Sequence, residues 1–161
     1  MLEYWLDLKN GKPGAPKAND FLVSKLWEMK IPHRVTIYDC SAENPANFRI
    51  THHAYHAGNT DWIYGAPVMG QPICSLRSSL ISEALQGDYL HSKGFQDDGT
   101  LLYTRVRQFI NGVHRDYSRL LLPFSGENGD VSMIVAAIRR NKLIVNGNNL
   151  QPDFRITQGN Q

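Results

Sequence analysis

The second half of the chain carries three strand-like runs rich in apolar residues, and these predict three consecutive strands. The expected strands cover residues 103–110, 113–124 and 131–138. Asn111-Gly112 separates the first two, and Asn-Gly favours a hairpin because a type I′ turn needs positive φ at both central residues. We therefore expect an antiparallel meander.

A two-residue turn also fixes the register of this hairpin. It predicts three cross-strand pairs: Ile110 with Val113, Val106 with Tyr117, and Arg107 with Asp116. The last pair joins opposite charges, which favours this alignment over its neighbours. The same register places Arg105 and Arg119 on opposite faces of the sheet, so only one of them can point inward.

The first half of the chain predicts one helix and two strands after a short amphipathic lead-in helix. Leu22, Leu26 and Met29 recur at helical spacing, Asn19 or Asp20 can cap the first turn, and Pro32 ends the pattern. Two strands follow, at 34–39 and 47–55. The turn-like link 41–45 predicts that they pair.

The middle of the chain is expected to be helical. Residues 58–70 are rich in Gly, Pro and aromatic residues, which indicates loops and short helical turns. Residues 73–92 predict the main helix, although Gly87 weakens its C-terminal end because Gly costs about 1 kcal/mol relative to Ala there.

This order of elements predicts an α+β fold: a PAS-like five-stranded antiparallel sheet with a helical crossover and an N-terminal helix. Three segments are expected, namely an N-terminal helical lead-in (1–31), the PAS-like domain (32–142) and a polar C-terminal tail (143–161). The basic residues Arg139, Arg140 and Lys142 are interpreted as a solvated exit from the last strand.

Several motifs also resemble a known family. They are Tyr4-Trp5-Leu6 with Gly11 and Pro13, Phe48-Arg49-Ile50, Gly58-Asn59 with Trp62, and the run Ser118-Arg119-Leu120-Leu121-Leu122-Pro123-Phe124-Ser125 followed by Gly129. Together they resemble small alphaproteobacterial PAS-like proteins. The resemblance implies a sensory or protein-interaction module in bacterial signal transduction, often dimeric, whose ligand varies between members.

Composition narrows the class of protein. The 161 residues fit one domain, and a formal net charge of +2 with dispersed basic residues does not indicate a nucleic-acid interface. The two cysteines, Cys40 and Cys74, are too few for a disulfide framework, which favours a reducing compartment. Without a signal peptide or an apolar run of about 20 residues, the sequence predicts a cytoplasmic protein with no membrane span.

Three chemical alternatives can be weighed against these expectations. In the cluster His52-His53-Ala54-Tyr55-His56, the first and last histidines share a face only if the segment is helical; if extended, they lie about 13 Å apart and cannot bind one metal ion. A haem-carrying sensor would use His91, with His56 as the second candidate, but no CxxCH motif supports covalent attachment. The identity of any cofactor stays open.

A small cysteine-dependent enzyme is the third alternative. Cys74 begins the predicted main helix, where a helix N-terminus can lower the pKa of a thiol. No nucleophile-elbow motif accompanies it. We therefore expect a non-catalytic domain.

Two sets of aromatic and apolar residues are the candidate sites. Trp62, Tyr89 and Phe109 are expected to line a small-ligand cavity between the sheet and the helices. Tyr4, Trp5 and Leu6 form an apolar patch that a lead-in helix can bury only against the sheet or against another subunit. We predict a homodimer formed through this helix, with a signalling protein of unknown identity as its further partner.

Overall fold

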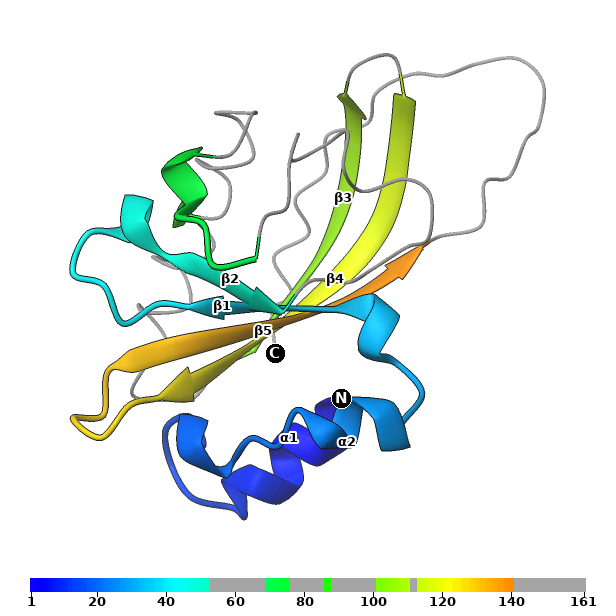
Figure 1. Cartoon of the computed structure of the whole chain (residues 1–161). Helices are drawn as coiled ribbons and strands as arrows, with labels where there is room; N and C mark the ends of the chain where they lie inside the picture. The colour runs from blue at the N-terminus through cyan, green and yellow to red at the C-terminus, as the bar shows by residue number, and fades with distance from the viewer. Residues whose placement is uncertain (53–68, 76–85, 88–100, 111–112, 141–161) are drawn as a thin grey trace.

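The computed structural model describes residues 1–52, 69–75, 86–87, 101–110 and 113–140 (Figure 1). For residues 108–110, 113–115 and 140 it describes the backbone alone. The predicted tail (143–161), the Asn111-Gly112 turn and most of the predicted crossover lie outside these ranges. None of the described helices has the length and apolar character required to cross a membrane.

Five antiparallel strands form one sheet, in the order β2-β1-β5-β4-β3. Their bounds are β1 Val35–Asp39, β2 Arg49–His52, β3 Leu102–Ile110, β4 Val113–Ser125 and β5 Val131–Arg140. The predicted α+β class, with a five-stranded antiparallel sheet and an N-terminal helix, is confirmed. Of the predicted 73–92 helix, the described part shows a 3₁₀ turn, η4 (Ile73–Ser75), and a helical pair at 86–87.

The predicted register of the hairpin is confirmed. Ile110 pairs with Val113, Val106 with Tyr117, and Arg107 with Asp116. In the same ladder Arg105 pairs with Ser118 and Arg119 with Thr104. Arg105 and Arg119 therefore lie on opposite faces of the sheet, as the sequence predicted.

Two α-helices precede the sheet, and the second differs from its prediction. The lead-in helix α1 (Leu2–Lys9) ends at Asn10, which adopts the left-handed conformation with φ of 47°. The next helix, predicted to begin at Asn19 or Asp20, is α2 (Ser24–Glu28), and a 3₁₀ turn, η1 (Ala18–Asp20), stands before it.

Phe21 explains this interruption. Its backbone is extended, with φ of −78° and ψ of 118°. Its buried ring lies between Tyr4 and Phe124, with centroid distances of 5.8 Å and 5.2 Å. Tertiary packing of this one aromatic ring overrides helical spacing, and Leu22 is left exposed.

The sheet is buried on both faces along β1, β4 and β5. In β1, Val35, Thr36, Ile37 and Tyr38 are all buried. One face, here called the helix face, packs against α1 and α2 through Trp5, Phe21, Leu26, Val35, Ile37, Leu122, Phe124 and Val135. The opposite face carries a separate core that includes Tyr38, Ile50, Ile73, Leu121 and Ile134.

Candidate functional site

The lead-in helix α1 packs on the sheet of its own chain. Trp5 is 2% exposed, and its indole Nε1 donates a hydrogen bond to the backbone oxygen of Pro123 at 2.8 Å. Tyr4 is half-buried and its hydroxyl accepts a hydrogen bond from the Leu22 backbone N–H, whereas Leu6 is 48% exposed. Of the three predicted dimerisation residues, Trp5 is thus held inside its own chain, and Leu6 remains accessible to a partner.

The helices cover only part of the helix face. On β3, Tyr103, Arg105 and Arg107 are exposed, whereas Thr104 and Val106 between them are half-buried. The register places the three exposed residues on the same face as Leu120, which belongs to the core under α1. The edge of the helix face formed by β3 is therefore exposed at these three residues.

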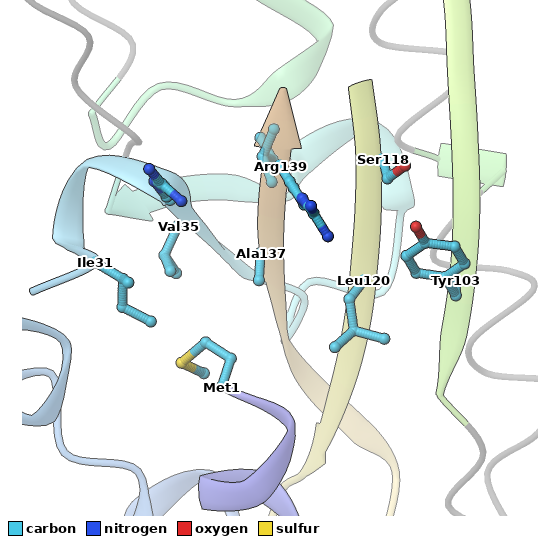
Figure 2. A pocket seen from close by; sticks show the side chains of 10 residues that line it. Met1, Ile31, Val35, Tyr103, Ser118, Leu120, Ala137 and Arg139 are labelled. Atoms are coloured by element: carbon cyan, nitrogen blue, oxygen red, sulfur yellow. The ribbon is translucent and has the colours of Figure 1, made fainter. Parts of the chain in front are cut away.

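A groove of about 210 Å³ lies between the start of α1 and this open part of the sheet (Figure 2). Met1, Ile31, Val35, Leu120 and Ala137 give it an apolar floor, and Arg34, Tyr103, Ser118 and Arg139 supply polar groups. We call it the arginine groove. Arg34 and Arg139 are far apart in the sequence, and the antiparallel pairing of Val35 with Ala137 brings them together at this groove.

Neither Arg34 nor Arg139 has an acidic partner among the residues that the structure describes. Both are exposed. Arg34 donates a hydrogen bond from Nε to the His33 ring at 3.2 Å, and within the described ranges no carboxylate pairs with either guanidinium. An arginine presents a planar set of donors that matches a carboxylate, so the groove suits an anionic group attached to an apolar body.

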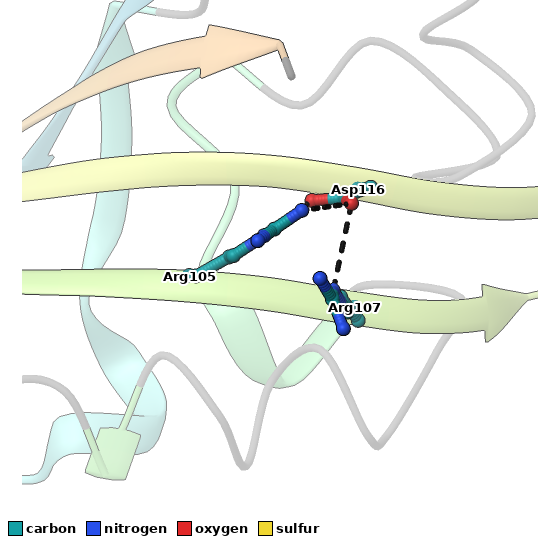
Figure 3. Close-up of polar contacts among 3 residues, drawn as sticks. All are labelled: Arg105, Arg107 and Asp116. Carbon is teal, nitrogen blue, oxygen red and sulfur yellow. Dashed lines mark hydrogen bonds and ion pairs between the residues drawn. The ribbon is translucent and has the colours of Figure 1, made fainter. Parts of the chain in front are cut away.

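A second arginine cluster lies on β3 and contacts Asp116 of β4 (Figure 3). Arg105 binds Asp116 through two hydrogen bonds of 2.9 Å and 2.6 Å, and Arg107 lies 3.5 Å from the same carboxylate. The hydrogen bond to Asp116 raises the pKa of Arg105. The predicted Arg107–Asp116 pair is present, but the diagonal partner Arg105 makes the closer contact.

The predicted ligand-site residues are only partly described. Trp62 and Tyr89 lie outside the described residues, and Phe109 stands in β3 opposite His114. The predicted cavity between sheet and helices is therefore still a prediction.

Of the histidines considered as metal or haem ligands, the structure describes only His52. His52 ends β2, where its Nε2 lies 3.1 Å from the Pro32 carbonyl oxygen and its ring packs at 5.6 Å from Trp27. His53, His56 and His91 lie outside the described residues. Among those the structure describes, no three His, Cys, Asp or Glu side chains gather as metal ligands.

The two cysteines occupy contrasting environments. Cys40 is buried, its Sγ lies 3.7 Å from the Tyr38 carbonyl oxygen, and burial raises the pKa of its thiol. Cys74 is exposed within the 3₁₀ turn η4. The two thiols therefore differ in exposure, and the buried thiol of Cys40 also has a raised pKa.

We expect a thiol reagent to modify Cys74 in the folded protein and to reach Cys40 only after unfolding, since the thiolate is the reactive form. Mass spectrometry after brief exposure to iodoacetamide at neutral pH measures this, and Cys74→Ser is the control that removes the early adduct. Early modification of Cys40 in the folded protein would contradict it. Fast labelling of Cys74 follows from its exposure and does not by itself indicate catalysis.

No protein-family model matches the chain, and the comparison with curated proteins found no match. Among solved structures, the PAS domain of Bordetella pertussis BvgS is 13% identical with a TM-score of 0.48, over 74% of this chain and 88% of that one. A fungal LOV domain photoreceptor is 12% identical with a TM-score of 0.36, over 66% and 73% of the two chains. An RNA-binding light-oxygen-voltage receptor is 15% identical with a TM-score of 0.41, over 79% and 36%. At such identities the similarity concerns the backbone fold alone.

Proposed function

We propose that this chain is a non-catalytic sensory or protein-interaction domain in bacterial signal transduction, and that it acts as a homodimer. One observation carries the proposal. Of the seven exposed large apolar side chains in the described ranges, six belong to the helical segment or to the face it covers: Leu2, Leu6, Leu22, Val23, Trp27 and Tyr103. Apolar side chains gathered on one side of a domain mark a surface for another protein.

The helix α1 supports a dimer because its apolar residues extend beyond the part that is buried. Trp5 and Leu8 contribute to the core of the helix face, whereas Leu2 and Leu6, in the neighbouring stripe of the helix surface, are exposed. Residues four apart share one side of a helix, so these two leucines form a continuous stripe. A helix that anchors itself through one stripe can present the other to a second subunit.

We further propose that a small ligand binds between the sheet and the helices, near Trp62, Tyr89 and Phe109. Phe109 follows Tyr103, Arg105 and Arg107 at every second position of β3, so its register position is on the helix face. The apolar core of that face supports this location, because ligand pockets are mostly lined by apolar and aromatic side chains. The two free cysteines are consistent with a reducing compartment, and we place the protein in the cytoplasm.

Native mass spectrometry, compared with the mass of the denatured chain, tests subunit number and bound ligand together. We expect the mass of a dimer. Excess mass that is lost on denaturation would identify a ligand, and a dimer without excess mass would favour an interaction domain. A monomeric mass at all concentrations would contradict the homodimer.

Leu6→Glu is expected to shift this dimer toward monomer, because it places a charge in the exposed leucine stripe of α1. We expect the dissociation constant to rise at least about tenfold, measured by sedimentation equilibrium. Met69→Glu is the matched control, since Met69 is similarly exposed but lies beside β2, away from α1. Equal effects of the two substitutions would argue against a dimer built on α1.

A further inference from the structure

We propose that the arginine groove of one copy binds the acidic side of α1 from a second copy. This inference rests on the proposed homodimer and names the surfaces that form it. Each subunit would then contribute one helix and one groove, related by a two-fold axis, and the interface would contain the same contact twice.

The acidic side of α1 consists of Leu2, Glu3, Leu6 and Asp7. All four are exposed, and the two leucines and the two acids each lie four residues apart, so leucine and carboxylate stripes run side by side. Within the described part of the chain neither Glu3 nor Asp7 forms an ion pair. The helix therefore presents an apolar stripe flanked by two carboxylates, neither of which pairs with a described cation.

The arginine groove is complementary to the acidic side of α1 in its apolar character and in its charge. Its floor of Ile31, Leu120 and Ala137 can take the leucines, and Arg34 and Arg139 can pair with the carboxylates. Such charge complementarity fixes the orientation of two docking surfaces and speeds their association. A purely apolar partner surface could cover the floor of the groove, but it would offer no carboxylate to either guanidinium group.

Adjacency within one chain makes the symmetric arrangement feasible. Met1, at the start of α1, itself lines the groove (Figure 2), so the helix and the groove form one continuous surface. An isologous interface requires this kind of patch, in which each half contacts the other half on the partner.

The shape of the groove favours a helix over a small carboxylate. Its volume of about 210 Å³ is below the ~300–1,000 Å³ of ordinary small-molecule pockets. It lies on the open part of a sheet face, beside the exposed Tyr103. A surface helix can cover such a groove, whereas a small ligand would keep much of its own surface in water.

A charge swap tests this contact. Glu3→Arg and Arg139→Glu are each expected to raise the dissociation constant of the dimer about tenfold or more, because each sets like charges against one another. The double variant E3R/R139E is expected to return it close to the wild-type value. Sedimentation equilibrium at fixed ionic strength measures all four proteins.

The mismatched pair Glu43→Arg with Arg139→Glu is the control. Glu43 is exposed in the loop between β1 and β2, so this variant has the net charge of the swap without restoring the contact, and the dimer should stay weak. A wild-type dimer that is insensitive to the single reversals, or is not restored by the swap, overturns the groove contact but leaves the homodimer standing. A wild-type chain that is monomeric throughout overturns the homodimer itself. Unchanged thermal unfolding of each variant confirms that association, and not folding, is measured.

Discussion

Trp5→Ala is expected to lower the free energy of unfolding by about 3–5 kcal/mol. The indole is 2% exposed and packs in the core of the helix face with residues that include Leu122 and Phe124. Removing it leaves a cavity that the surrounding sheet cannot fill. It also removes the donor for the Pro123 carbonyl oxygen, which Trp5 Nε1 contacts at 2.8 Å, and an unpaired buried acceptor adds to the cost.

Urea denaturation followed by circular dichroism measures this change. Leu6→Ala is the control one residue along the same helix: because Leu6 is 48% exposed, its truncation should change the free energy of unfolding by less than about 1 kcal/mol. A loss below about 1 kcal/mol for Trp5→Ala would mean that α1 contributes little to folding, and the packing described for α1 would be wrong.

The burial of Trp5 against its own sheet also determines which substitutions can test dimerisation. The sequence places Tyr4, Trp5 and Leu6 in one patch and leaves open whether the sheet or another subunit covers it. Because Trp5 packs on its own sheet, a dimer lost on Trp5→Ala would report unfolding of α1 as readily as loss of an interface. Leu6→Glu and the Glu3–Arg139 swap separate these two effects, since all three residues are exposed.

The sequence predicts the β-hairpin well because its register is a local property. Only two residues separate Ile110 from Val113, and once they pair, every later pair along both strands is determined. The register does not determine which side chains form the closest ion pair. Asp116 stands opposite Arg107, yet its shorter contacts are to Arg105, because a long side chain can reach diagonally across a twisted ladder.

The arginine groove could not have been predicted from local patterns. Arg139 reads as the solvated end of a strand, and Arg34 as the start of another. They meet because β1 pairs with β5, with Val35 opposite Ala137, across a sequence separation that includes the whole middle of the chain. Phe21 gives a similar lesson for helices: it follows the residues expected to cap a helix, but its backbone is extended and its ring packs against Phe124.

The second large effect is expected at two neighbouring leucines of β4. Leu121→Ala and Leu122→Ala should each lower the free energy of unfolding by about 2–5 kcal/mol. Leu121 is 1% exposed and packs in the core of the opposite face, whereas Leu122 is fully buried under α1 and α2. Consecutive residues of a strand point to opposite faces, so similar losses at both positions require cover on both faces of the sheet.

Leu120→Ala is the matched control, since Leu120 lies on the same strand but is half-buried at the arginine groove. Its truncation should cost less than either neighbour because the groove already admits water. Equilibrium denaturation of the three variants gives the ranking. A Leu121→Ala variant as stable as Leu120→Ala would mean that the opposite face is not covered, and the packing described for that face would be wrong. A large loss at Leu121 with unchanged dimerisation would show that the two faces serve separate roles, one holding a closed core and the other presenting α1 and the arginine groove to a second subunit.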